Sequence, residues 1–294
     1  MVEDIGSVIG KGFETWKGNL CICLPFVFTA ILTLLVALII IGGAIVAAIP
    51  SLPSLIPMLS KPDEFTPELF LPLMPQIIRN IGIIIAAVII TIISALLINA
   101  FFTAGAIGMA KEATETGRTD LSDMKEYGGS KFVSLLFADL IVGIITLLGL
   151  VFLIPGILYV LPNLSSGIMP SAPNNVMALA IFGLGFLGMI LYMLIISIIL
   201  ALSRYAVVID DLGAIEGVKT GFNRFTHHKV DVFLLWLVTL VISIAVSFIL
   251  GAIPHIGQFI SMLVSIIAIE PLIVIWWSRL YLSMTKPEND ELII

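Results

Sequence analysis

The sequence predicts an all-α fold, a polytopic membrane bundle of six transmembrane helices. Of the 294 residues, 60% are apolar and 12% are charged, whereas a soluble domain carries about 25% charged residues. The apolar residues gather into runs that exceed the ~20 residues with which a helix crosses a ~30 Å hydrocarbon core. These runs are rich in Leu and Ile without polar alternation, and backbone amides in lipid need internal partners. The runs are therefore helices and not strands of a barrel.

Six runs are expected to span the membrane within a single domain, residues 1–294. Their expected bounds are 20–48, 81–103, 132–154, 176–202, 232–253 and 256–277. The first run is longer than the ~7–15 apolar residues of a signal peptide, so we expect it to be retained as an anchor. The third run ends at Pro155-Gly156. Only Pro254 and His255 separate the last two runs, which predicts a tight hairpin.

A proline-rich segment, 50–76, separates the first two runs. Its seven prolines are interleaved with Leu, Ile, Met and Phe, so it can be neither a regular helix nor a well-solvated loop. We expect it outside the cytoplasm, either along the membrane interface or over the mouth of the bundle, with a re-entrant segment as the alternative. After the second run, charged residues return, and Thr119 or Asp120 is expected to cap a short helix.

The distribution of basic residues predicts the orientation, because Lys and Arg near the ends of spans mark the cytoplasmic side. The N-terminus, the second-to-third loop, the fourth-to-fifth loop and the C-terminal tail hold 2, 4, 4 and 2 of them. The opposite side holds only Lys61 and Arg79. The sequence therefore predicts a multi-pass protein of the cytoplasmic membrane with both termini in the cytoplasm.

The polar stretch 203–231 predicts an amphipathic helix between the fourth and fifth runs. Its apolar side chains recur every three or four residues and form one stripe. They are Leu212, Ile215, Val218, Phe222 and Phe225. Such a helix lies flat in the headgroup layer or docks against the bundle, and Asp210 or Asp211 is expected to cap its start.

Three glycines lie four residues apart beside this stripe, at Gly213, Gly217 and Gly221. They would let another helix approach closely. The alternative is that they only weaken the helix.

Parts of this stretch recur elsewhere in the chain. The dipeptide Gly-Phe occurs at 12–13 and again at 221–222, each time shortly before an apolar run. The dipeptide Ser-Arg follows the fourth run at 203–204 and the sixth run at 278–279. These matches predict three repeated units, each an interfacial helix followed by a hairpin of two spans. A coincidence of composition at the membrane edge is the alternative.

Three segments carry a resemblance that covers nearly the whole chain. They are GFETWKGN before the first run, AGAIGMAKEATETGRTDLSD after the second and SRYAVVIDDLGAIEGVKTGF after the fourth. In the order of these elements the chain resembles an uncharacterised prokaryotic six-span family, related to the membrane domain attached to some glycerophosphodiester phosphodiesterases. The resemblance implies a bundle associated with membrane lipid. It supplies no catalytic residues, because the phosphodiesterase chemistry belongs to a separate soluble domain.

Ionisable residues within spans are costly and are therefore functional candidates. Asp139 lies seven residues after Phe132, and Glu270 lies seven residues before Trp277, so both are expected ~10 Å inside the cytoplasmic boundary. Asn99 and Thr239 are expected near the same depth, and these four polar side chains could form one layer that binds a cation or relays protons. The alternative is that each one satisfies neighbouring groups without a shared function.

Basic side chains at the cytoplasmic edge are candidates for contact with lipid headgroups or with a protein partner. They are Arg204, Lys219, Arg224, His228, Lys229 and Arg279. His227 and Asp231 lie one helical turn apart and could share a metal ion, but no third strong ligand lies at metal-binding spacing. Solvated or phosphate-facing side chains are the alternative, and we expect no metal and no cofactor.

Signatures of catalysis do not occur in this sequence: it has no phosphate-binding glycine loop, no nucleophile elbow and no HExxH pair. We expect a membrane protein that is not an enzyme and that acts through contacts with membrane lipids, other membrane proteins or itself. Nucleic acid is not an expected partner, because no strongly basic region occurs. The alternative is a small transporter in which Asp139 and Glu270 couple ion or proton movement.

Overall fold

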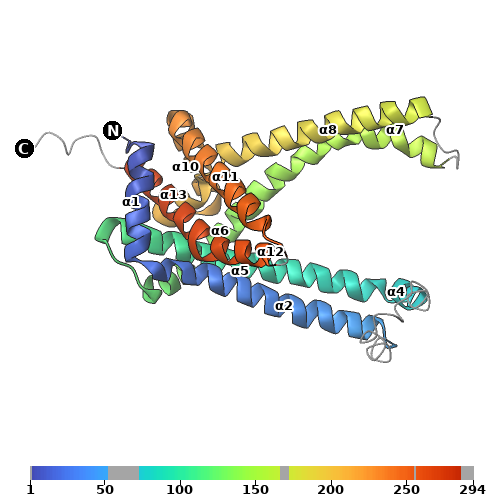
Figure 1. The fold of residues 1–294 in the computed structure, drawn as a ribbon, viewed down its shortest axis with the longest axis horizontal. Helices are drawn as coiled ribbons and strands as arrows, with labels where there is room; N and C mark the ends of the chain where they lie inside the picture. Colours follow the sequence, from blue (N-terminus) through green and yellow to red (C-terminus); the bar gives the residue numbers. More distant parts are fainter. Residues whose placement is uncertain (1, 52–72, 166–171, 255, 286–294) are drawn as a thin grey trace, which may run out of the picture.

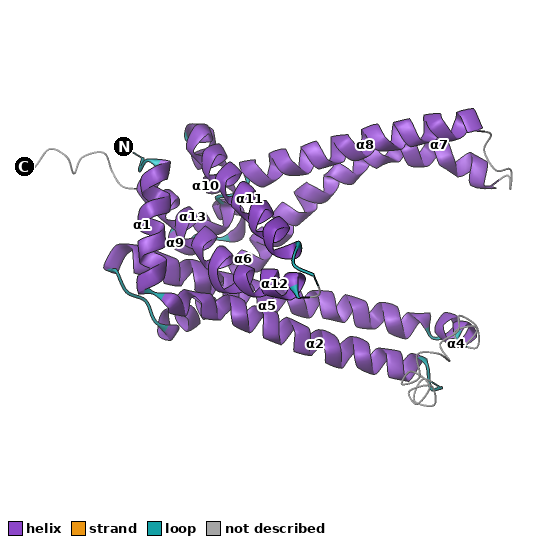
Figure 2. Ribbon diagram, in the orientation of Figure 1, coloured by secondary structure: helices purple, strands orange, loops and turns teal. Residues whose placement is uncertain are grey.

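The structure is a computed structural model that describes residues 2–51, 73–165, 172–254 and 256–285. Over these ranges the chain is helical and contains no strand (Figure 2). Six helical stretches are long and apolar enough to cross a membrane, which confirms the all-α polytopic class. They are Leu20–Ala48, Ile81–Thr116, Leu121–Tyr159, Val176–Ile209, Lys229–Gly251 and Gly257–Thr285. Most of the predicted proline-rich segment, 52–72, lies outside the described residues.

The helices follow one another with short connections. From the N-terminus they are α1 (Ile5–Gly18), the 3₁₀ turn η1 (Leu20–Cys23), α2 (Leu24–Ala48), α4 (Met74–Arg79), α5 (Ile81–Thr116) and α6 (Leu121–Leu147). They continue with the 3₁₀ segment η4 (Leu148–Leu153), α7 (Ile154–Ser165), α8 (Ala172–Ile199), α9 (Ser203–Ile209) and α10 (Ala214–His227). The last are α11 (Lys229–Gly251), α12 (Gly257–Val264), the π-helical segment η5 (Ser265–Ile269) and α13 (Glu270–Thr285).

Three hairpins extend from one compact end of the molecule (Figure 1). The first pairs α2 with α5, the second pairs the end of α6, η4 and α7 with α8, and the third pairs α11 with α12. The first and second hairpins diverge away from the compact end (Figure 1). We call the compact end the platform. It comprises α1, α9, α10, residues 100–116 of α5, residues 121–138 of α6 and residues 272–285 of α13.

Helix α5 belongs to both parts because it is 36 residues long. At 1.5 Å per residue this is about 54 Å, well beyond a hydrocarbon core of about 30 Å. The apolar run ends near Thr103, but the following Ala-rich sequence consists of good helix formers and continues the helix to Thr116. Gly117 then ends it in the left-handed conformation (φ 84°), as glycine does after many helices.

The capping prediction for the next helix is right for Asp120. Its side chain accepts from the backbone of Ser122, and Asp123 completes a reciprocal capping box. The predicted short helix is wrong, however, because α6 runs without a break to Leu147. The unit with the third predicted span therefore has no separate interfacial helix. Its chain also stays helical past Pro155, which lies in the first turn of α7, where the missing amide costs little.

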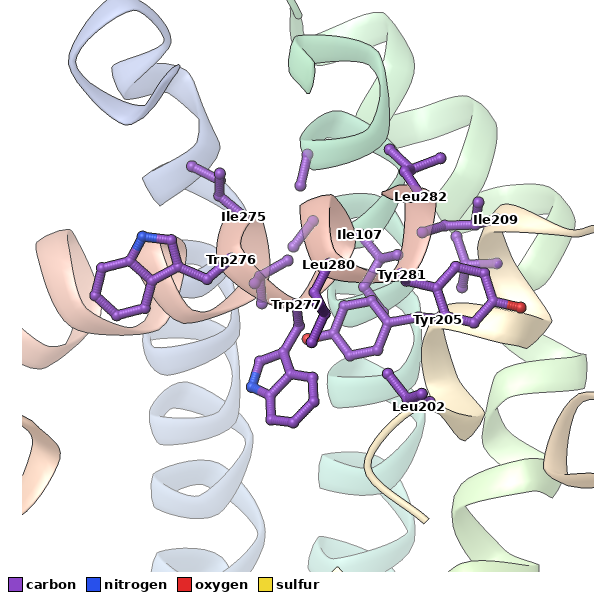
Figure 3. Packing of buried hydrophobic residues seen from close by; sticks show 14 of the residues in the cluster. Ile107, Leu202, Tyr205, Ile209, Ile275, Trp276, Trp277, Leu280, Tyr281 and Leu282 are labelled. Carbon is purple, nitrogen blue, oxygen red and sulfur yellow. The ribbon is translucent and has the colours of Figure 1, made fainter. Parts of the chain in front are cut away.

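The main hydrophobic core lies in the platform and not between the spans. Buried side chains from α1, α5, α6, α9, α11 and α13 form one cluster. Figure 3 shows members of this cluster gathered closely, among them Ile107 of α5, Tyr205 of α9 and Tyr281 of α13. The rings of Tyr205 and Trp277 stack with centroids 6.2 Å apart. The platform is thus a folded unit in its own right, from which the apolar hairpins extend.

Glycines bring the helices of the platform into close contact. A Cβ at Gly12 of α1 would collide with the indole of Trp276 on α13, and a Cβ at Gly221 of α10 would lie 2.6 Å from the Ser203 nitrogen of α9. Gly128 of α6 packs in the same way on the side chain and carbonyl of Phe101 on α5. In each case an early helix of one predicted unit packs on the segment that follows another unit's hairpin. The first and last units are therefore joined through α1 and α13.

Candidate functional site

Asp139, one of the predicted intramembrane carboxylates, forms an ion pair. Its Oδ1 lies 2.7 Å from Nε of Arg204, which is at the start of α9. The Asp139 side chain is 16% exposed, so the arginine replaces most of the water that this carboxylate would otherwise bind. The pair connects α6 with α9. It engages two predicted candidates at once, since Arg204 was expected to face headgroups.

The other members of the predicted polar layer are not joined to Asp139 by any hydrogen bond or ion pair in the part of the chain that the structure describes. Asn99 accepts a hydrogen bond from Thr103 on its own helix at 3.2 Å. Thr239 is buried and donates to the carbonyl of Trp236 at 2.9 Å. Glu270 is exposed and directly follows η5. The structure shows local satisfaction for two of these residues and a carboxylate with no partner among the described residues for the third.

Asp210 holds three platform helices together, which the sequence analysis did not foresee. Its Oδ2 accepts from Arg224 of α10 at 2.9 Å and from the hydroxyl of Tyr281 of α13 at 2.6 Å. The Arg224 guanidinium also lies 4.4 Å from the centroid of the Tyr281 ring. The prediction that Asp210 or Asp211 caps α10 is wrong, because Gly213 is the N-cap and no side chain caps it. Arg224, expected at the lipid surface, is instead 20% exposed.

Arg279 is likewise engaged within the platform. Its Nε and Nη2 donate to the two carboxylate oxygens of Glu3 at 2.8 and 3.0 Å, and this pair fixes α1 against α13. Burial alone would raise the pKa of Glu3, but hydrogen bonds from Arg279, Ser7 and Lys11 outweigh it and lower the pKa to about 2. Glu3 is therefore ionised under all ordinary conditions. The indole of Trp276 adds a hydrogen bond to the carbonyl of Ile9 at 3.2 Å.

The remaining candidates lie around the ends of α10. Lys219 and Lys229 are exposed, and neither ammonium forms an ion pair or hydrogen bond with the described residues. His228 lies 3.9 Å from Asp231, whereas Nδ1 of His227 lies 2.8 Å from the carbonyl of Asn223. The predicted pairing of His227 with Asp231 is thus replaced by His228 with Asp231. In the described ranges no group of three or more potential ligands could hold a metal ion.

Asn19 is a structural residue that its sequence position only partly announced. It is 6% exposed and lies between α1 and η1. Its amide donates to the carbonyl of Gly117 at 3.2 Å and its oxygen accepts from the amide of Thr119 at 3.1 Å. These bonds tie the first span to the turn between α5 and α6. A polar residue directly before an apolar run was the only signal in the sequence.

Two cavities border the platform. The first, about 390 Å³, is formed by the end of α8, the end of α10 and the start of α11, and Lys229 is its only basic lining residue. The second, about 570 Å³, lies between α6 and the start of α10 and includes Ser134 and Glu216. Neither Asp139 nor Glu270 lines either cavity. Chemically, the first cavity suits a hydrocarbon chain with an anionic group at one end.

The fold and these contacts define a multi-pass α-helical protein in which a folded platform carries apolar hairpins. The chain belongs to a family described as a domain of unknown function, DUF7847, which matches residues 26–276. It is also similar to an uncharacterised protein of Archaeoglobus fulgidus, with 24% identity over 299 residues that cover 99% of each chain. No solved structure matches the chain.

Proposed function

We propose that the protein is a non-enzymatic component of the cytoplasmic membrane that acts through contacts with membrane lipid. The observation that carries this proposal is the low burial within the spans. In the most apolar 18-residue window of each span, between 0% and 28% of the residues are buried within the protein, and the value for the first span is 0%. Such spans need a hydrocarbon covering along most of their length.

The amphipathic helices support the same proposal. On α10, Val218 and Phe225 of the predicted stripe pack on the platform core, whereas Ile215 and Phe222 are 62% and 47% exposed. Phe13 of α1 is also exposed, at 40%. Apolar side chains on the outside of a helix with charged neighbours are typical of helices that lie in the headgroup layer. The platform is therefore proposed to lie at the membrane boundary.

The proposed orientation has the platform on the cytoplasmic side. The basic residues of the described ranges belong to the platform and the start of α11, except for Arg79 at the end of α4. Helix α4 lies at the far end of the first hairpin (Figure 1). An excess of Lys and Arg marks the cytoplasmic side. A kinship with the membrane domain attached to some glycerophosphodiester phosphodiesterases is part of the proposal, and since neither match names such an enzyme it rests on the sequence motifs.

The test is the dependence of the purified full-length protein on lipid. We expect the protein to retain lipid through purification, to unfold at a lower temperature after stepwise removal of that lipid with detergent, and to recover when lipid is returned. Size measurements by light scattering are made in parallel. A lipid-free dimer or larger assembly with an unchanged unfolding temperature would refute lipid as the covering and indicate a second copy instead.

A second candidate function is transport. It is favoured by η5, a π-helical segment directly before Glu270 and Pro271. Single π-helical turns are frequent at functional sites, and transporters often bind coupling ions at interruptions of a span. Glu270→Gln in liposomes with a pH gradient tests this candidate through the rate at which the gradient dissipates. Transport predicts a slower rate for this variant, and an unchanged rate would exclude a coupling role for Glu270.

The matching test at Asp139 needs a control for structural damage, because its substitution also breaks the pair with Arg204. Asp139→Asn and Arg204→Gln are therefore compared. If both variants change the rate equally, the effect comes from the lost ion pair. If only Asp139→Asn slows dissipation, the carboxylate itself takes part in transport.

A further inference from the structure

The cavity between α8, α10 and α11 is open to the membrane side of the platform and is built from three helices. Ile195 and Ile199 come from the end of α8, Phe225 from the end of α10, and Lys229 and Phe233 from the start of α11. Its volume of about 390 Å³ lies within the range of small-molecule sites, about 300–1,000 Å³. Apart from Lys229, the lining residues are apolar.

Lys229 is set apart from the neighbouring arginines by its lack of a partner. Arg204 is paired with Asp139, and Arg224 is paired with Asp210. The ammonium of Lys229 contacts no carboxylate in the described ranges, although the side chain lines the cavity. A cation beside an apolar cavity, without a carboxylate of its own, is complementary to an anion at the end of a hydrocarbon chain.

The start of α11 adds to this complementarity. Lys229 is the first residue of a 23-residue helix, and its N-cap, His228, makes no capping hydrogen bond with its side chain. The first amide groups of such a helix favour an anion, and a lysine at this end is unfavourable unless an anion is present. Next to it, Val230 is 68% exposed and Phe233 is 45% exposed. Both side chains lie where a hydrocarbon chain would cover them.

We infer that this cavity binds one membrane lipid with an anionic headgroup. The lipid chain occupies the apolar cavity along Ile195, Ile199 and Phe233, and the headgroup anion contacts the Lys229 ammonium and the first amides of α11. This inference rests on the proposed function, since it names the class of lipid and the place where it binds.

The experiment uses the full-length protein in nanodiscs that contain phosphatidylglycerol or phosphatidylcholine with a photoreactive diazirine in the chain. After illumination, the cross-link yield is measured on peptides that contain residues 195–199 and 225–233. We expect the anionic probe to give the higher yield. Lys229→Gln should lower the yield with phosphatidylglycerol about fivefold, because one basic residue near a membrane surface contributes about that factor. The yield with phosphatidylcholine should stay unchanged.

Lys219→Gln is the matched control for charge. Lys219 is also exposed and without a partner among the described residues, but it does not line the cavity. We expect it to leave the yield unchanged. An equal loss in both variants would show a general attraction to the anionic surface and would overturn the site.

Val230→Trp tests the cavity itself, with Val241→Trp on the same helix as its control. Val230 lines the cavity and Val241 does not, and both are exposed. We expect Val230→Trp to reduce cross-linking of both lipids at these peptides and Val241→Trp to leave it unchanged. Equal yields in the two tryptophan variants would overturn the cavity as the binding place.

Two further outcomes separate the possible sources of failure. Excess inorganic phosphate at constant ionic strength should not reduce the yield, and a reduction would mean that the site recognises free phosphate and not a lipid. If Lys229→Gln has no effect while the wild type still retains lipid during purification, the site is refuted and the proposed function stands. If the wild type retains no lipid, the proposed function fails as well.

Discussion

The closest helix contact of the platform that depends on a glycine is that between α10 and α9, and Gly221→Ala tests it. The added Cβ would lie 2.6 Å from the nitrogen and 2.7 Å from the Cα of Ser203, and 2.9 Å from the carbonyl carbon of Leu202. All three are backbone atoms, so no side chain can turn away. To reach an ordinary contact of 3.4 Å, α10 must move by about 0.8 Å.

Two opposing terms set the size of the effect. Overpacking of this kind costs about 1–3 kcal/mol, whereas Gly→Ala within a helix contributes about 1 kcal/mol of stability. The control Gly10→Ala has only the second term, because nothing lies within 4 Å of a Cβ at that position of α1. The helix term cancels in the comparison. The free energies of unfolding of the two variants should therefore differ by about 1–3 kcal/mol.

The assay is thermal unfolding of both variants and the wild type in the same nanodiscs. Gly10→Ala is expected to unfold at or above the wild-type temperature, and Gly221→Ala below that of Gly10→Ala by about 2 °C or more. The reasoning would be refuted if the two variants were stabilised equally. That outcome would mean that α10 can separate from α9 without loss, and that the platform is not held by this contact.

Two further predictions concern the ion pairs and hydrogen bonds of the platform. The pKa of Glu3 is about 2, below its ordinary 4.5, so its stabilising contribution is complete above about pH 5 and is lost as the pH falls toward 2. The difference in unfolding temperature between the wild type and Arg279→Gln should therefore shrink by roughly half from about pH 6 to about pH 3, and a constant difference would contradict the pairing. Tyr281→Phe removes the 2.6 Å hydrogen bond to Asp210 and should cost about 1–2 kcal/mol in unfolding free energy, whereas an unchanged unfolding temperature would show that Arg224 alone satisfies Asp210.

The extent of the helices follows from the sequence because hydrocarbon allows little else. Every long apolar run became a helix, since its backbone amides have no water to bond. The ends were harder to predict. Helix α5 continues past Thr103 because helix formers follow the apolar run, and hydropathy does not register them. The reverse holds at Pro155, where a residue that usually interrupts helices lies in a first turn.

The candidate site was less predictable because its residues meet over long separations in the chain. Arg279 pairs with Glu3 across 276 positions, and Arg204 pairs with Asp139 across 65. Local rules gave the wrong role to Asp210, since capping is a property of neighbours in sequence and does not foresee a tyrosine from another helix. The glycine prediction was right at Gly217 and Gly221, which pack on α9, and wrong at Gly213, which has nothing within 4 Å.

The sequence by itself determined that the protein is helical, that six helices are long enough to span a membrane, and that its basic residues gather on one side. These properties depend on composition and period along one chain segment at a time. Only the tertiary structure decided which charges are consumed in pairs, because that depends on where the three hairpins bring distant helices together. It leaves Lys229 beside an apolar cavity as an unpaired cation, while its arginine neighbours hold the platform together.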